Sequence, residues 1–382
     1  MFAQLTLVVA ASLAGPLLAA GTRGLLPAVV GELAIGALLG HTGFRVVDPG
    51  ASAFPVFHAL GFAMLMMTAG THVDLRSQEM RRGAGRGTLA LVAVAVVAAP
   101  AGFLVASLLG FDHPALLGVL LAGSSAAVAF PIIEENHLKG PAVSYLIAWI
   151  ALADTVTVVL MPLTVEGGGR VAATLGGDAA IVAVGLLVLG AALWLRRLAL
   201  VPGLVEMSRR RGWALQLRLS MVVLLLLLAV AETAGASTLV AGFLAGIILV
   251  HLGEPDRLAL QISGVANGFF VAMFFVLLGA QLDLRALAGA PTAMLLAAAM
   301  ALGAIAVHVA AALLTAPARR LPAGLSASAQ LGLPAAAASL GLADHALPPA
   351  VAAAVVAAGC LTLLPAAFGA NLLARPAGPG PE

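Results

Sequence analysis

Long apolar runs, separated by short polar stretches, make up most of the chain. Several of them reach the ~20 residues that a membrane-spanning helix needs. We count thirteen runs, at about residues 4–20, 25–42, 53–73, 88–110, 115–133, 142–165, 179–195, 214–231, 236–250, 263–281, 290–316, 323–343 and 348–372. The pattern predicts an all-α polytopic membrane protein with about thirteen transmembrane helices. The ninth run is short, so the count depends most on it.

Composition excludes a soluble fold. Of the 382 residues, 62% are hydrophobic and 9% are charged, whereas soluble domains carry roughly 25% charged residues. The net charge of +2 is carried by short loops and does not indicate a nucleic-acid partner. The lipid bilayer is therefore the expected surrounding of most of the chain.

Basic residues predict the orientation. If the N-terminus lies outside, all but three of the 19 Lys and Arg fall in inside loops, the exceptions being Arg45, Arg170 and Arg285. This asymmetry is a positive-inside signal and predicts a multi-pass protein of the inner (plasma) membrane with a cytoplasmic C-terminus. We expect a basic loop at 196–218, a transmembrane domain over 1–375 and a disordered cytoplasmic tail over 376–382.

Asp154 is the clearest polar exception within an apolar run. It lies near the centre of the sixth run, with no basic residue within a helical turn. A central charge costs about 2.5–3.5 kcal/mol on insertion scales, so the carboxyl group is expected to bind a proton or a cation. The alternative is a protonated Asp that bonds a neighbouring helix. Thr155 and Thr157 could assist as ligands, although bonds to their own helix backbone are the preferred interpretation.

Two apolar runs contain helix-weakening residues. Ser124 and Ser125 follow a glycine in the fifth run, and Gly332 and Pro334 interrupt the twelfth. Broken helices in transporters expose backbone groups to an ion, so we expect both runs to be broken. Ordinary close packing through small residues is the alternative.

Three further polar residues are weaker candidates. His308 lies within the eleventh run, where it could relay protons or pair with Asp154, or could instead be a neutral ring bonded to a backbone carbonyl. Glu232, on the outer side, and Glu134, on the inner side, could draw cations into an access funnel. Solvated loop carboxylates are the alternative for both.

Motifs of other chemistries are missing from the sequence. It contains no P-loop, no HExxH, no serine-nucleophile elbow and no potassium-channel filter, and its histidines have no metal-ligand spacing. We therefore expect neither an enzyme nor a cofactor. Gly36-x-x-x-Gly40 and Gly242-x-x-x-Gly246 predict close helix contacts, within the chain or across a dimer.

Four stretches resemble a known family. Residues 26–40, 60–75, 235–246 and 274–284 are similar, in that order, to signatures of the second family of monovalent cation:proton antiporters, the Kef-type and bacterial sodium/proton exchangers. The resemblance implies an inverted-repeat fold with a core and a dimerisation domain, a homodimer and elevator-type alternating access. It also implies that the fifth and twelfth helices cross beside Asp154 as the ion-binding carboxylate.

The chain departs from the family pattern near that aspartate. Many members have Asp or Asn where this chain has Ala153, and Lys or Arg where it has His308. With one carboxylate left, we expect Asp154 to carry one proton or one monovalent cation, Na⁺ or K⁺, in electroneutral exchange. The alternatives are a proton- or sodium-coupled carrier of a small organic solute and a non-transporting scaffold or sensor.

Overall fold

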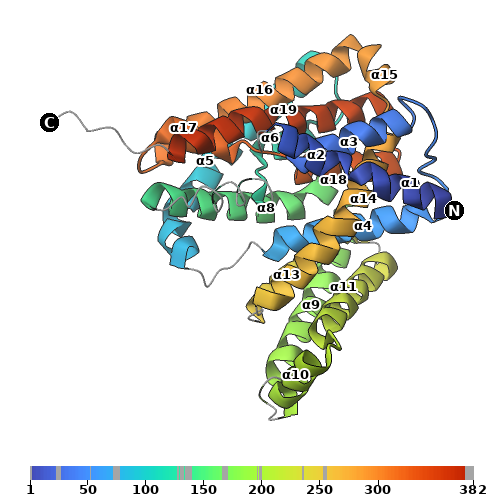
Figure 1. Cartoon of the computed structure of the whole chain (residues 1–382). Helices are drawn as coiled ribbons and strands as arrows, with labels where there is room; N and C mark the ends of the chain where they lie inside the picture. Colours follow the sequence, from blue (N-terminus) through green and yellow to red (C-terminus); the bar gives the residue numbers. More distant parts are fainter. Residues whose placement is uncertain are drawn as a thin grey trace. The chain divides into compact units, whose positions relative to one another are not determined.

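A computed structural model describes residues 2–22, 27–51, 53–71, 78–126, 129, 133, 140–165, 171–195, 197, 200–234, 236–252 and 256–374. All regular secondary structure within these ranges is helical (Figure 1), which confirms the predicted all-α class. The chain divides into two compact units. The tail at 376–382 lies outside the described residues.

The first unit comprises Met1–Pro49, Leu75–Gly167 and Phe275–Glu382. Its helices are α1 (Phe2–Ser12), α2 (Ala14–Gly21), α3 (Ala28–Leu39), α5 (Gln78–Leu109), α6 (Pro114–Ala122), α8 (Pro141–Val165), α15 (Leu284–Ala288), α16 (Pro291–Thr315), α17 (Arg320–Ala327), α18 (Gly332–Ala343) and α19 (Pro349–Ala374). Helix α8 packs against α5, α6, α17 and α18, so it is central to this unit.

The second unit comprises Gly50–Asp74 and Gly168–Phe274. Its helices are α4 (Phe54–Thr71), α9 (Val171–Leu195), α10 (Leu200–Arg211), α11 (Leu215–Ala234), α12 (Thr238–His251), α13 (Asp256–Val265) and η1, one π-helical turn (Ala266–Phe270). Helix α14 (Val271–Gln281) contains the boundary between the units. Within the second unit, α12 packs against α4, α9 and α11.

Among the described residues, nine helical stretches are long and apolar enough to cross a membrane. Two shorter apolar helices, α3 and α12, match the second and ninth predicted runs. The fifth run is interrupted after α6, and the twelfth is divided into α17 and α18. The exact count of thirteen stays a prediction.

Two predicted boundaries were wrong. Helix α5 begins at Gln78, ten residues before the predicted run at 88–110, so Arg82 and Arg86 lie on a helix rather than in a loop. The predicted basic loop at 196–218 contains α10. Arginine is a good helix former, so a helix can extend beyond its apolar part. In α10, an ion pair between Arg210 and Glu206 at 3.0 Å adds i,i+4 support.

Glycines bring helices into backbone contact within the chain, as predicted from their spacing. A Cβ on Gly36 would collide with the backbone of Val276, and one on Gly40 with that of Ala280. In the second unit, a Cβ on Gly242 would lie 2.6 Å from the carbonyl oxygen of Ala63. Small residues thus allow the close approach that drives helix association in lipid.

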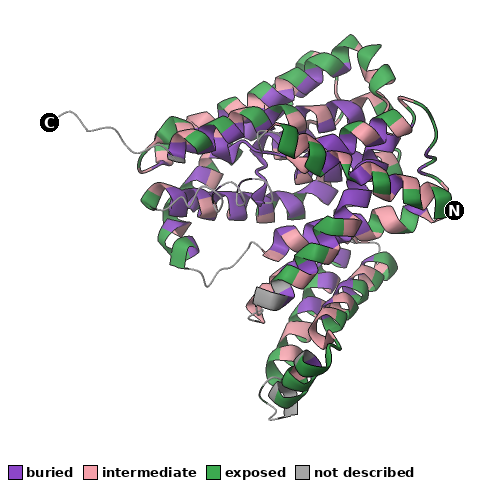
Figure 2. Cartoon of the chain, in the orientation of Figure 1, coloured by how far each residue is buried: buried purple, intermediate pink, exposed green. Residues whose placement is uncertain are grey.

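Helix α5 has an inner stripe made mostly of Gly and Ala and an outer face that carries large apolar side chains. Its buried residues recur every three or four positions: Met80, Gly83, Gly87, Ala90, Val94, Ala98, Gly102 and Ala106. The face with Leu89, Val96 and Phe103 is exposed in the isolated chain. Figure 2 colours the exposed residues of the helices green. Such an apolar outer face is what a lipid-facing helix presents.

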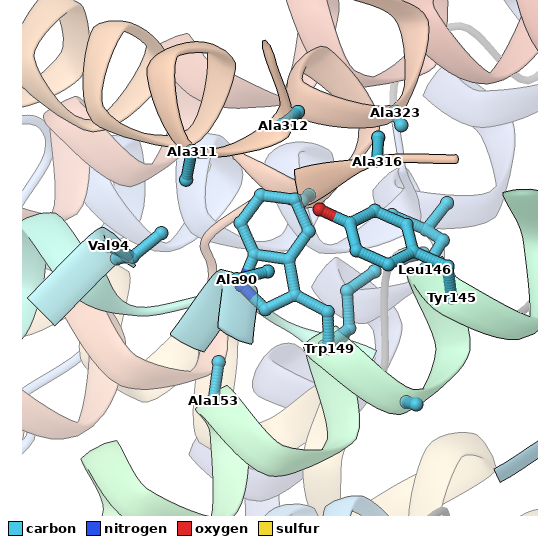
Figure 3. Packing of buried hydrophobic residues seen from close by; sticks show 14 of the residues in the cluster. Ala90, Val94, Tyr145, Leu146, Trp149, Ala153, Ala311, Ala312, Ala316 and Ala323 are labelled. Atoms are coloured by element: carbon cyan, nitrogen blue, oxygen red, sulfur yellow. The ribbon is translucent and has the colours of Figure 1, made fainter. Parts of the chain in front are cut away.

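A large apolar cluster fills the first unit around Trp149. Trp149 and Tyr145 lie one helical turn apart on α8, below alanines of α16 that include Ala311 and Ala312 (Figure 3). Trp149 is fully buried, and its ring centroid lies 5.6 Å from that of Tyr145. Packing around these two rings fixes the position of α8 within the unit.

Candidate ion-binding site

The fifth apolar run is broken where the sequence predicted. Helix α6 ends at Ala122, and Gly123 is extended, with φ −67° and ψ 148°. Ser124 and Ser125 are not helical, and the chain is helical again at Ala126. The Ser125 carbonyl accepts the Ala129 amide at 3.1 Å.

The twelfth run is also broken, slightly before the predicted position. Helix α17 ends at Ala327 and α18 begins at Gly332, so the break covers 328–331. Gly332 and Pro334 are the first and third residues of α18 rather than the break itself. Proline has no N–H for the carbonyl four residues earlier and its ring clashes there. A continuous helix is therefore disfavoured at Gln330, four residues before Pro334.

Hydrogen bonds join the two breaks. The Gln330 side chain donates from Nε2 to the Gly123 carbonyl at 2.7 Å, and Ser124 Oγ lies 2.7 Å from the Ala327 carbonyl. The backbone N–H of Gln330 in turn donates to Thr362 Oγ1 of α19 at 3.0 Å. These groups are buried, so the two unwound stretches meet inside the first unit.

Asp154 lies beside this meeting point. It is near the middle of the 25-residue helix α8 and only 6% exposed. Its Oδ2 accepts a hydrogen bond of 3.3 Å from the backbone amide of Ala126. Ala126 directly follows the non-helical Gly123–Ser125 stretch, and its backbone amide is paired by this side chain. Asp154 thus accepts a backbone N–H from the broken stretch, and this hydrogen bond favours the charged carboxylate.

Oxygen atoms and helix ends together define what the site can do chemically. A carboxylate beside unwound backbone carbonyls offers the hard oxygen ligands that monovalent cations accept in transporters. The same carboxyl group can accept a proton instead. The Ala126 amide requires only an acceptor, which either form of Asp154 provides.

The two threonines after Asp154 bond their own helix. Thr155 Oγ1 donates to the Ala151 carbonyl, and Thr157 Oγ1 to the Ala153 carbonyl, each at 2.7 Å. This geometry is the backbone bonding preferred in the sequence analysis. A ligand role for Thr155 gains no support from it.

His308 touches the broken segment rather than Asp154. Its Nδ1 lies 2.8 Å from the Ala304 carbonyl and its Nε2 lies 3.2 Å from Ser124 Oγ. The ring is fully buried and stacks on Trp149, with 5.4 Å between centroids and 24° between planes. The described hydrogen bonds thus place His308 at the crossing. It bonds Ser124, whereas Asp154 bonds Ala126, two residues further along the chain.

The two carboxylates suggested for an access funnel are not brought to this site by the described contacts. Glu232 is exposed near the end of α11, in the second unit. Glu134 lies outside the described residues. Both assignments stay predictions.

Sequence reasoning missed two contributors to the crossing. Gln330 ties the breaks together, and Trp149 covers one face of His308. Gln330 could have been noticed as a lone amide in an otherwise small and apolar run, since buried polar groups need partners. Nothing local distinguishes Trp149, because its role depends on the position of α16.

A cavity of about 600 Å³ opens at one end of α8. It is lined by Glu79, Arg82, Arg86, Ser144 and Tyr145, among others, and the Glu79 carboxylate accepts a hydrogen bond from Ser144. From Tyr145 to Asp154 the helix rises about 13 Å. The cavity therefore ends short of the crossing.

The sequence matches known proteins over most of its length. It is 24% identical over 300 residues to a putative Na(+)/H(+) antiporter, YjbQ, of Bacillus subtilis, covering 74% of this chain and 48% of that protein. It is 29% identical over 282 residues to the glutathione-regulated potassium-efflux system protein KefC of an Enterobacter species, covering 71% and 44%. The chain thus spans about half the length of these curated relatives.

A solved structure shares the fold. The sodium proton antiporter MjNhaP1 from Methanocaldococcus jannaschii, determined at pH 8, superimposes with a TM-score of 0.66 over 98% of each chain at 16% sequence identity. Residues 8–372 match the transmembrane family of sodium/hydrogen exchangers. This multi-pass membrane protein therefore belongs to the sodium/hydrogen exchanger family.

Proposed function

We propose that the chain exchanges a monovalent cation, Na⁺ or K⁺, for H⁺ across a membrane. The observation that carries the proposal is the buried Asp154 carboxyl group beside the point where two broken helices meet. Relatives named as Na⁺/H⁺ antiporters and as a potassium-efflux protein support the same chemistry.

In this mechanism the proton and the cation compete for Asp154. With the site open to one side, a cation displaces the proton and is held by the carboxylate and by unwound backbone oxygens. With the site open to the other side, a proton displaces the cation. The family suggests elevator-type alternating access in a homodimer.

One-for-one exchange is supported by Asp154 being the one carboxylate at the crossing among the described residues. Ala153 is apolar and fully buried one residue before Asp154, so it supplies no second charge. One proton and one monovalent cation carry equal charge in opposite directions. We therefore propose that exchange is electroneutral. We also propose that the protein acts as a transporter and not as an enzyme.

Purified protein in liposomes with an internal pH dye tests the proposal. An imposed Na⁺ or K⁺ gradient should move protons in the opposite direction, whereas a choline gradient should not. Proton movement that responds to neither Na⁺, K⁺ nor Li⁺ would contradict it. A flux driven only by an organic solute would favour a coupled solute carrier instead.

The charge distribution supports an orientation. We propose that the N-terminus lies outside and the C-terminus in the cytoplasm of the plasma membrane. The cavity near Arg82 and Arg86 would then open to the cytoplasm, because both arginines are among the basic residues assigned to the inside.

A further inference from the structure

Ser124 has two hydrogen-bond acceptors within reach at the crossing. Its Oγ lies 2.7 Å from the carbonyl oxygen of Ala327 and 3.2 Å from Nε2 of His308. Ser124 is 1% exposed and His308 is fully buried. Water therefore has little access to either side chain and cannot readily replace a hydrogen bond that one of them loses.

The His308 ring is held in one tautomer. Its Nδ1 lies 2.8 Å from the Ala304 carbonyl, which can only accept, so Nδ1 carries the proton. A second ring proton would leave a buried charge, and no carboxylate is among the described hydrogen-bond partners of His308. The Nε2 atom that faces Ser124 is therefore an acceptor.

One hydroxyl proton cannot satisfy both acceptors. When Ser124 donates to Ala327, Nε2 of His308 has no donor from this hydroxyl. When Ser124 donates to His308, the Ala327 carbonyl is released. Ala327 is the last residue of α17, and the carbonyls at a helix C-terminus have no partner within the helix and carry partial negative charge.

We propose that His308 is a positioning residue for cation binding: by accepting the Ser124 hydroxyl, it frees the Ala327 carbonyl to act as a cation ligand at the crossing. Ser124 and Ala126, whose amide bonds Asp154, are two residues apart at the break that follows α6. The freed carbonyl and the carboxylate therefore belong to the same small region. This role rests on the proposed cation exchange.

Two substitutions in combination test the proposal. His308→Phe keeps a ring to stack on Trp149 but removes the competing acceptor, so Ser124 should stay on Ala327. The KM for the cation should rise about fivefold, the equivalent of one hydrogen bond of about 1 kcal/mol, with kcat little changed. Ser124→Ala added to His308→Phe should restore the KM to that of Ser124→Ala alone, because nothing then occupies the Ala327 carbonyl.

The controls separate this role from a structural one. His308→Gln, whose Oε1 can accept from Ser124, should keep the KM near that of the wild type. A His308→Phe variant that exchanges with an unchanged KM would overturn the proposal. So would a double variant that is worse than either single variant, since lost packing accumulates. If the wild-type protein shows no cation-driven proton movement at all, the proposed function fails rather than the role of His308.

Discussion

Ala153 shows at the scale of one residue how this site departs from the family pattern. It is fully buried in the apolar cluster that contains Trp149, one turn along α8 from that ring. A second carboxylate here would lie among the apolar side chains around Trp149, on which His308 stacks. Among the described residues, Asp154 is therefore the acidic side chain that the structure brings to the crossing.

Ala153→Asp should destabilise the protein. An unpaired buried charge costs about 3–5 kcal/mol, so the melting temperature in detergent should fall clearly. Adding His308→Lys should recover part of the loss by supplying a partner. Ala151→Asp, on the opposite face of α8 and also fully buried, is the matched control that His308→Lys should not rescue. Equal rescue of both variants would contradict the assignment.

Gln330 was not predicted, although its side-chain hydrogen bond to the Gly123 carbonyl joins the two breaks. Gln330→Ala leaves the Gly123 carbonyl buried without its side-chain donor, which should cost about 1–3 kcal/mol. Chemical denaturation in detergent measures the loss. Ser220→Ala, which removes only a hydroxyl bonded to its own helix at Gln216, should change stability far less. Equal losses of stability in the two variants would contradict a stabilising role for the hydrogen bond between Gln330 and Gly123.

At the scale of elements, helix contacts depend on missing side chains. Gly36 of α3 lies against the backbone of Val276 in α14, so Gly36→Ala forces the two helices apart. Overpacking of this kind costs about 1–3 kcal/mol. Gly190→Ala in α9, where an added Cβ meets nothing within 4 Å, should instead be neutral or stabilising by up to about 1 kcal/mol. Thermal melting of both variants measures the difference, and a harmless Gly36→Ala would contradict the contact.

The elements were largely predictable from the sequence, and their meeting was not. Apolar runs locate helices because lipid requires internally bonded backbone, and Ser124–Ser125 and Pro334 marked the two breaks to within a few residues. The prediction placed the second break on Gly332–Pro334, whereas it lies at 328–331. Proline disrupts the turn before it, so the break precedes Pro334. The bonds between Gln330 and Gly123, and between Ser124 and Ala327, depend on chain segments about two hundred residues apart. Local patterns do not encode such pairings.

At the scale of the whole molecule, orientation can be measured with single cysteines. After Cys360→Ala, the variant Arg285→Cys should react with an impermeant thiol reagent added outside intact cells. Arg210→Cys should react only once the membrane is permeabilised, because the proposed topology places the basic loops in the cytoplasm. Both positions are exposed. The reverse pattern would contradict the proposed topology.

The proposed electroneutral exchange can be tested by measuring whether the transport rate depends on membrane voltage. With Asp154 as the one carboxylate that the described residues bring to the crossing, the exchange rate in liposomes should not change when a potassium-diffusion potential is imposed with valinomycin, using Na⁺ as the exchanged cation. A clear dependence on voltage would indicate a second charge that moves with the site and would contradict one-for-one exchange.

The central claim is that Asp154 carries the proton and the cation in turn, and Asp154→Asn tests it most directly. Asparagine can still accept the Ala126 amide, so the variant should fold. It cannot bind a proton and a cation alternately, so cation-driven proton movement in liposomes should fall to the background of empty vesicles. Asp178→Asn, at another buried aspartate of an apolar helix, is the matched control and should retain exchange. Normal exchange by a folded Asp154→Asn protein would contradict the mechanism.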